Sequence, residues 1–436
     1  MAKSTGSQEI GLIGAIFIVC SNVMSSGISL LPANMAAIGS ITIISWFLAI
    51  VGALSLAYVF AKLGLKDPEI GGPVAYAEEL SPALGYQTGL LYWISNWIGN
   101  LGTTITGVVY LSIIFRQLVN PLEAGIVTII FVWTFTIINC FGANKIVKLS
   151  SLTMILLMIP IICTATFGWA HFSTHTFVMN WNVSGEAPHT AIFSGILLAI
   201  WSFIGIESAS VNSGAIHNPK RNIPLATMIG TAFAGLVYLA STTVISGMYP
   251  ATIIEHSGAP FAITFASLVG NWSKPLVAIV TALACLASLG TWIMVVGQAS
   301  VAAANNGILP KIFAKKSQKY GTPIWGMILN STFMSALMVV LLFLGAKNST
   351  VVFGYIVSIS VLLIILPYFY SCLQLIRVEG FHKKSLPTFI ISLFACIFCF
   401  VALIGAKKIP LTGFLIVALI CFIFYAIFLH RHKNKS

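Results

Sequence analysis

Charged residues are scarce in this chain of 436 residues: Asp, Glu, Lys and Arg together make up only 7% of it. That is roughly a quarter of the share that a soluble domain carries. Hydrophobic residues make up 58%, and a soluble fold cannot hide so much apolar surface because a large part of its exterior faces water. The composition therefore excludes a soluble globular protein and predicts a single integral membrane domain over residues 1–436.

Catalytic and nucleotide-binding motifs are missing as well. The chain has no P-loop, no dinucleotide fingerprint and no nucleophile elbow, and no nucleophile–base pair stands at membrane depth. His171 and His175 have the spacing of a metal pair but lack the accompanying glutamate, so neither a metal nor a cofactor is expected. These absences argue against an enzyme, and they leave solute or ion gradients rather than ATP as the energy source.

Two features that suggest other kinds of protein are better explained by a membrane. All eight cysteines lie in or at the ends of apolar runs, including Cys396 and Cys399, which indicates small core residues rather than disulfides. The net charge is +12, but the basic residues stand singly or in small groups between apolar runs, without a basic stripe. The expected partner is therefore the lipid bilayer and not nucleic acid.

The apolar runs have the length of membrane spans, since a helix needs about 20 apolar residues to cross a bilayer. We predict about 12 transmembrane helices and hence an all-α polytopic membrane protein. The twelve runs are residues 11–33, 39–63, 84–116, 121–142, 148–170, 190–215, 226–248, 275–303, 326–346, 351–377, 387–406 and 409–430.

The placement of Lys and Arg supports this number of spans. If the chain crosses the membrane at each run, all but five of the 22 basic residues fall on one side. The five on the other side are Arg116, Lys274, Lys347, Lys407 and Lys408. Because basic residues concentrate in cytoplasmic loops, both termini are predicted to be cytoplasmic.

Two of the runs are interrupted at membrane depth. The first contains Ser25, Ser26 and Gly27 in its middle, and the sixth contains Gly205 beside Glu207. Matching breaks in two halves are typical of inverted-repeat transporters whose substrate site lies at the midplane. We therefore expect a first five-helix repeat over residues 1–170, a second over residues 190–377, and two additional helices, 11 and 12, over residues 387–430.

Glu207 is the one acidic residue of the ten that is predicted to lie in the middle of a membrane span. The other nine lie in loops or near the ends of spans. A carboxylate at the bilayer centre costs about 2.5–3.5 kcal/mol on insertion scales and needs a cation, a proton or a water-filled cavity. No Lys, Arg or His lies at comparable depth in another span. The missing cation is a substrate or a proton, and the alternative is a protonated Glu207 that is hydrogen-bonded between helices.

The breaks supply further candidate groups. Unwound backbone at Ser26 and Gly27 would point N–H groups toward a carboxylate, and free carbonyls at Trp201 and Ile204 would accept from an ammonium group. Aromatic residues at the same depth either stack on a cation or simply pack. They are Tyr92, Trp93, Trp201, Trp292 and Tyr368.

Asn96 and Asn100 are four residues apart and therefore share one face of a helix. Their amides either bind the amine of a substrate or hydrogen-bond one helix to another.

Six segments resemble the basic amino acid/polyamine antiporters of the amino acid–polyamine–organocation (APC) superfamily, and the resemblance extends over nearly the whole chain. They are residues 22–32 (NVMSSGISLLP), 71–77 (GGPVAYA), 97–100 (WIGN), 201–208 (WSFIGIES), 218–224 (NPKRNIP) and 366–371 (LPYFYS). The resemblance implies a LeuT-like 5+5 inverted repeat with broken helices 1 and 6, a homodimer, and a multi-pass protein of the bacterial inner membrane.

The implied activity is exchange of an external basic amino acid for its internal decarboxylation product. The segments at residues 247–250, 257–261, 375–380 and 396–403 favour the lysine/cadaverine branch, with arginine/agmatine or ornithine/putrescine next. Coupled to a cytoplasmic decarboxylase, such exchange would contribute to acid resistance. The alternatives are a proton-coupled amino-acid symporter of the same fold and a nutrient sensor that binds without transporting.

The resemblance also assigns roles to individual residues. The implied substrate-binding residues are Val23, Ser26, Gly27, Asn96, Asn100, Trp201, Ile204, Trp292 and Ser360. Ser26 and Gly27 would hold the carboxylate, backbone at Val23, Trp201 and Ile204 the α-ammonium group, and Trp292 would stack on the side chain. Asn96, Asn100 and Ser360 would meet the distal cation. The implied gating and proton-sensing residues are Tyr92, Glu207 and Tyr368.

The chain departs from the family pattern at two positions. Ser25 stands where the family usually has the leading glycine of the first break, and Asn306 stands where the cadaverine branch has Asp. The first change would stiffen the break or add a hydroxyl group, and the second removes an acid that would attract polyamines or gate the cytoplasmic face.

Overall fold

The computed structural model describes residues 10–24, 26–66, 72–142, 144–207, 216–305, 310–343, 348–380 and 385–433. Within these ranges the chain is helical, and the β-type pairing is confined to one isolated parallel bridge between Ile10 and Ile216. The all-α prediction is therefore confirmed.

The long helices follow one another along the whole chain. They are α3 (Thr42–Lys66), α5 (Pro82–Leu111), α6 (Pro121–Cys140), α7 (Asn144–Phe167), α11 (Pro219–Met248), α14 (Ser273–Asn305), α15 (Ile324–Phe343), α16 (Ser349–Glu379), α17 (Leu386–Ile404) and α18 (Lys408–Lys433). Nine of these helices are long and apolar enough to cross a membrane. The exception is α5, which is long but more polar, as its Gly, Ser, Thr and Asn content explains.

Shorter helices connect the long ones or belong to interrupted segments. They are α1 (Leu12–Val23), α2 (Leu31–Ala36), α4 (Pro73–Leu80), α8 (Thr174–Met179), α9 (Pro188–Trp201), α12 (Ala251–Glu255) and α13 (Pro260–Val269). Short 3-10 turns also occur, among them η1 (Ser26–Ile28) and η3 (Gly168–His171). The three predicted spans beyond the nine correspond to α5, to α1 with α2, and to the segment that begins with α9; that these three cross the membrane stays a prediction.

Proline begins many of these helices, because its missing N–H group would have no partner in the first helical turn. The largest difference between the start of a predicted run and that of its helix occurs at the seventh run. This run begins at residue 226, whereas α11 begins at Pro219 and continues through Pro224. Apolar run length marks where a helix enters lipid, whereas Pro219 marks where the helix itself begins.

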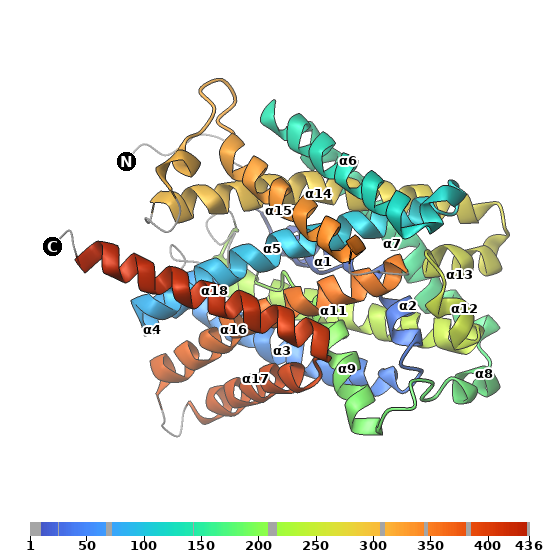
Figure 1. Cartoon of the computed structure of the whole chain (residues 1–436). Helices are drawn as coiled ribbons and strands as arrows, with labels where there is room; N and C mark the ends of the chain where they lie inside the picture. Colours follow the sequence, from blue (N-terminus) through green and yellow to red (C-terminus); the bar gives the residue numbers. More distant parts are fainter. Residues whose placement is uncertain are drawn as a thin grey trace.

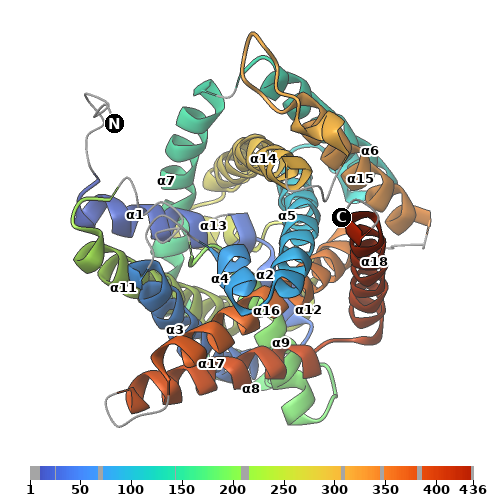
Figure 2. The same ribbon diagram turned by 90° about the vertical axis from the view of Figure 1, so that its left-hand side faces the viewer.

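The long helices run in roughly one direction (Figure 1), as expected for a bundle that crosses a bilayer. α8, α12 and α13 lie at one end of the bundle, and α4 lies at the other end together with the last turns of α18. Viewed along the bundle, α5 and α14 lie near the centre with α16 beside them, while α1, α7 and α11 form one side (Figure 2).

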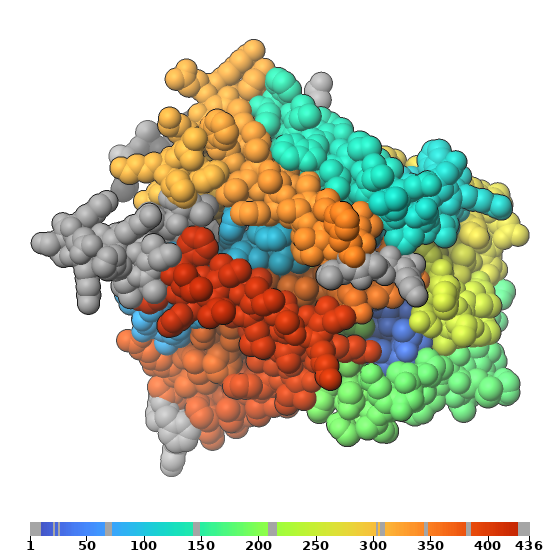
Figure 3. Space-filling view, in the orientation of Figure 1, coloured from blue at the N-terminus to red at the C-terminus, as the bar shows by residue number. Residues whose placement is uncertain are grey.

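The central helix α5 packs along α14 and α16 over most of its length, and α11 packs on α3 and α1. On the outside, α18 and α15 leave only a strip of α5 visible (Figure 3). α18 carries the exposed apolar side chains Ile416, Leu419 and Phe422, as expected for a helix in contact with lipid. This arrangement places the polar face of α5 in the interior, beside both interrupted segments.

Candidate functional site

Both interruptions predicted from the sequence are present as breaks in helical structure. α1 ends at Val23, a single 3-10 turn follows, and α2 begins at Leu31. α9 ends at Trp201, and the backbone then turns through Gly205, whose φ angle of 104° favours glycine. Ser25 and residues 208–215 lie outside the described residues. Each break frees backbone groups at the depth where a substrate would bind.

A cavity of about 50 Å³ lies between the two breaks, bordered by α5, α14 and α16. Six predicted substrate-binding residues line it: Asn96, Asn100, Trp201, Ile204, Trp292 and Ser360. These side chains come from segments up to 264 positions apart, so only the packing of the helices brings them together. A cavity of this volume holds only a few water-sized groups.

The indole of Trp201 lies between two glycines and separates the cavity from the first break. A Cβ atom at Gly27 would lie 2.8 Å from Nε1 of Trp201, and one at Gly99 would lie 2.7 Å from its Cη2 atom. Gly27 belongs to the first break and Gly99 to α5, so the indole bridges these two elements. The absence of a side chain at Gly27 and Gly99 therefore leaves room for the Trp201 indole.

Two polar atoms at this site are buried without a hydrogen-bond partner among the described residues. They are the indole N–H donor of Trp201 and the amide oxygen of Asn100, an acceptor that belongs to the cavity lining. Buried polar groups in proteins are nearly always hydrogen-bonded. A donor beside the first break suits a carboxylate, and an acceptor on α5 suits an ammonium group.

Ser360 lies in the cavity wall, but its hydroxyl group already bonds α16 to α5. Its Oγ atom donates to the carbonyl of Ser95 at 2.9 Å, and Oγ of Ser95 donates to the carbonyl of Ser360 at 2.8 Å. The two hydroxyl oxygens are 2.9 Å apart. This reciprocal pair fixes the distance between the helices, and a direct contact of Ser360 with substrate stays a prediction.

The predicted gating residues Tyr92, Glu207 and Tyr368 form one hydrogen-bonded group. The Tyr92 hydroxyl group donates to one carboxylate oxygen of Glu207 at 2.9 Å, and the Tyr368 hydroxyl group donates to the other at 2.8 Å. Glu207 is only 3% exposed. The group links the second break to α5 and α16, and the amide of Asn96 extends it toward the cavity by donating to the Tyr92 carbonyl at 2.6 Å.

Other predicted residues lie away from the cavity wall. The Val23 carbonyl accepts from the Tyr238 hydroxyl group at 2.9 Å, and Gly27 lies behind the Trp201 indole. Ser26 begins the 3-10 turn, and its side chain is outside the described residues, as is Asn306. Trp93 points elsewhere, since its indole donates to Ser300 at 3.0 Å and packs on Phe333.

The sequence-based prediction missed four lining residues, namely Asn22, Ser95, Gly99 and Thr103. Three of them were detectable, because Ser95, Gly99 and Thr103 are spaced four apart beside Asn96 and Asn100. That spacing places all five on one face of α5. Within the described ranges, no three His, Cys, Asp or Glu side chains gather into a metal site. The chemistry of the cavity is therefore that of neutral polar and aromatic groups, with one carboxylate behind them.

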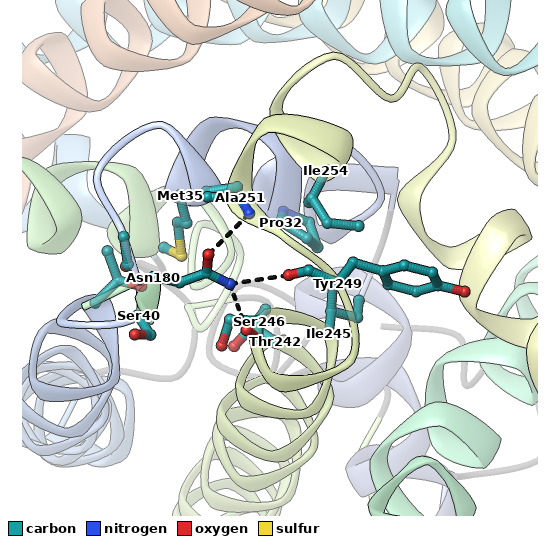
Figure 4. Close-up of a pocket in the computed structure, with 13 residues that line it drawn as sticks. Pro32, Met35, Ser40, Asn180, Thr242, Ile245, Ser246, Tyr249, Ala251 and Ile254 are labelled. Carbon is teal, nitrogen blue, oxygen red and sulfur yellow. Dashed lines mark hydrogen bonds between the residues drawn. The ribbon is translucent and has the colours of Figure 1, made fainter. Parts of the chain in front are cut away.

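A buried asparagine, Asn180, connects several elements at the end of the bundle that carries α8 and α12 (Figure 4). Asn180 is 6% exposed. The Asn180 amide donates to the carbonyls of Ser246 and Tyr249 at 2.8 and 2.9 Å and accepts from the N–H group of Ala251 at 2.9 Å. The backbone carbonyl of Asn180 accepts from Ser40 at 2.8 Å. One residue thus joins α8 to α11, α12 and the start of α3.

Replacing Asn180 with Ala should destabilise the protein by about 1–3 kcal/mol, because it leaves one buried N–H group and two carbonyls without their partners. Thermal unfolding in detergent, followed by size-exclusion chromatography of heated samples, measures this change. Asn182→Ala is the matched control, since the Asn182 side chain bonds only to Ser184 and Glu186 within its own loop. An equal loss of stability in the two variants would contradict the role assigned to Asn180.

The amino acid permease family matches residues 10–432. The cadaverine/lysine antiporter of Escherichia coli K12 is 47% identical over 435 residues, which is 99% of this chain and 98% of that protein.

Two putrescine transporters are more distant relatives. The putrescine transporter PotE of Escherichia coli K12 is 30% identical over 86% of this chain and 84% of its own. The putrescine transporter PotE of Haemophilus influenzae is 32% identical over 84% of each chain. The interrupted helices, the cavity between them and these full-length similarities agree: the chain belongs to the amino acid permease family of multi-pass membrane transporters, and it is not an enzyme.

Proposed function

We propose that this chain exchanges external lysine for internal cadaverine across the inner membrane of a bacterium. The observation that carries the proposal is the 47% identity to a cadaverine/lysine antiporter over 99% of this chain. Arginine/agmatine and ornithine/putrescine are the next candidate pairs. The similarity to two putrescine transporters supports ornithine/putrescine as an alternative.

The geometry of the site supports a substrate with a carboxylate at one end and a cation at the other. The indole N–H group of Trp201 and the backbone of the first break, including Ser26 and Gly27, would bind the carboxylate. The buried amide oxygen of Asn100 would accept from the distal ammonium group, with Asn96 beside it. Trp292 lines the space between these ends and would stack on the side chain.

Exchange of these two solutes moves charge. Lysine carries a net charge of +1 and cadaverine +2, so each cycle would export one positive charge. Decarboxylation of lysine consumes a proton, and a cytoplasmic decarboxylase would return the amine that the next cycle exports. The transporter and the decarboxylase together would remove protons from the cytoplasm. We therefore propose acid resistance as the physiological role.

The hydrogen-bonded group of Tyr92, Glu207 and Tyr368 would couple substrate to movement. Its carboxylate is held behind the cavity wall by hydroxyl groups from two helices, so any rearrangement of the second break must break one of these bonds. A cationic substrate offsets part of the cost of a buried carboxylate. An empty carrier would therefore cross slowly, as an antiporter requires, and protonation of Glu207 would make the rate respond to pH.

The orientation of the chain belongs to the same proposal. The excess of Lys and Arg lies on the side where α3 and α18 end, so we place both termini in the cytoplasm. The ion pair between Lys407 and Glu186, 3.5 Å apart, then lies on the outside. The 5+5 repeat with two additional C-terminal helices and assembly into a homodimer complete the proposed architecture.

Purified protein in liposomes should take up radiolabelled lysine only when the vesicles contain cadaverine, because the unloaded carrier crosses slowly. Arginine with internal agmatine and ornithine with internal putrescine are the comparison pairs, and the fastest pair identifies the substrate. Protein-free vesicles provide the background.

The alternative of a proton-coupled symporter predicts a different result. It would accumulate lysine in empty vesicles under an inward proton gradient, and that outcome would overturn the exchange proposal. Saturable lysine binding without any flux would instead indicate a sensor, and it would overturn the proposal equally.

A further inference from the structure

An apolar groove of about 450 Å³ lies between α1, α7 and α11 and is far larger than the substrate cavity. Its walls include Ile13 and Phe17 of α1, Ile155 and Met158 of α7, and Ile229 and Phe233 of α11. These helices form one side of the bundle (Figure 2), so the groove opens toward the hydrocarbon of the bilayer.

The groove exists because its three helices pack unevenly. α1 packs closely along α11, where a Cβ atom at Gly230 would lie 2.8 Å from Val19. α7 packs instead on α14 and α11 and touches α1 only over a short stretch. The space between α1 and α7 is therefore left without protein side chains. Water does not fill an apolar space of this kind, so lipid is the available occupant.

An exposed arginine, Arg221, lies on α11 before the groove, toward the end at which that helix begins. Arg221, Leu225, Ile229 and Phe233 are spaced four apart and form one ridge along α11. The last three are apolar and between 38% and 46% exposed. Arg221 is exposed, and its guanidinium group has no hydrogen bond or ion pair within the described part of the chain. It lies about 12 Å along the helix from Ile229.

The start of α1 lies at the same level as Arg221. The Ile10 carbonyl accepts from the His217 N–H group at 3.0 Å, which ties the residues before α1 to those before α11. Ile13, 84% exposed, follows less than one turn into α1. Arg221 therefore lies on the side of the groove where α1 and α11 begin, and the groove lining runs from Ile13 along α1 and from Ile229 along α11.

We infer that this groove binds one anionic phospholipid, with an acyl chain between α1 and α7 and its phosphate headgroup at Arg221. Acyl chains gain little from moving between bilayer and groove because both are apolar. Selectivity must therefore come from the headgroup, and one arginine near the surface corresponds to about fivefold preference for an anionic over a zwitterionic lipid. The proposed orientation of the chain makes the leaflet beside Arg221 the cytoplasmic one, whose surface is negative.

Native mass spectrometry of the full-length protein in detergent tests this inference with two lipids, phosphatidylglycerol and phosphatidylcholine, at equal concentration. The wild type should retain one phosphatidylglycerol about fivefold more than phosphatidylcholine. Arg221→Gln should abolish the preference. The matched control is Lys220→Gln, which removes the neighbouring exposed charge from a position about 100° around the helix and should leave the preference unchanged.

A second pair of variants tests the tail of the lipid. Ile229→Trp fills the groove and should abolish retention, while Leu236→Trp, on an exposed part of α11 outside the groove, should not. Equal retention of the two lipids by the wild type, or a preference that survives Arg221→Gln, would overturn the inference. A dimer that only Ile229→Trp dissociates would also overturn it, because the groove would then join two copies of the chain. Neither readout depends on transport, so failure of the exchange proposal leaves this test intact.

Discussion

Replacing Glu207 with Gln should reduce lysine/cadaverine exchange at least about a hundredfold and flatten its dependence on pH. Glutamine keeps the size of the side chain, but its NH2 group cannot accept a hydrogen bond. One of the two tyrosine hydroxyl groups therefore loses its acceptor, at a cost of about 1–3 kcal/mol, and the site loses its negative charge. A factor of ten in rate corresponds to about 1.4 kcal/mol, so a hundredfold reduction corresponds to about 2.8 kcal/mol. The lost hydrogen bond and the lost negative charge together account for this free energy.

The measurement is the initial rate of lysine uptake into cadaverine-loaded vesicles over a series of pH values. Glu186→Gln is the matched control, because Glu186 forms an ion pair with Lys407 at the surface and such pairs contribute only about 0–1 kcal/mol. It should transport like the wild type. Normal, pH-dependent exchange by Glu207→Gln would remove Glu207 from the mechanism.

Gly99→Ala should lower exchange about tenfold or more by displacing the Trp201 indole. The added methyl group would lie 2.7 Å from Cη2 and 3.0 Å from Cζ3 of Trp201, and overpacking of this kind costs about 1–3 kcal/mol. The indole cannot simply shift, because its opposite edge already lies against Gly27. The same uptake measurement reports the effect.

Gly89→Ala provides the matched control on the same helix. Its methyl group would meet only Val74, at 3.9 Å, and alanine in a helix interior is favoured over glycine. The variant should fold and transport normally. Trp201→Phe removes the ring atoms that clash with the new methyl group, and it also removes the indole N–H group that would bind the carboxylate. Gly99→Ala should therefore slow the Trp201→Phe variant less than it slows the wild type. An equal loss of rate in the two backgrounds would show that the clash with Trp201 is not the cause.

Much of the fold was predictable because a bilayer imposes its requirements on each segment separately. Nine of the predicted runs appear as helices long and apolar enough to span the membrane, and α6 begins at the predicted residue, Pro121. Both breaks were visible from glycine and serine at membrane depth. What the apolar runs could not show were the short helices at the ends of the bundle, such as α8 and α12, since these lie outside lipid and are held by contacts such as those of Asn180.

The candidate site was predictable in its residue types and less so in its geometry. Glu207 stood out from the sequence because a lone carboxylate at membrane depth is costly. The two tyrosines that donate to its carboxylate are at positions 92 and 368, and no local pattern pairs them with Glu207. Trp93, adjacent to Tyr92, was an equally good candidate until helix packing turned it toward Ser300.

The sequence by itself thus determined that this is a helical membrane protein, where its spans lie, and which two of them are interrupted. These properties depend on run length, composition and backbone preference, each of which is local to about twenty residues. Only the tertiary structure decided that Trp201 lies between Gly27 and Gly99, that Ser95 and Ser360 join α5 to α16, and that an apolar groove opens between α1, α7 and α11. Such contacts depend on how helices far apart in the chain rotate and approach one another, and single-segment periodicity carries no information about that.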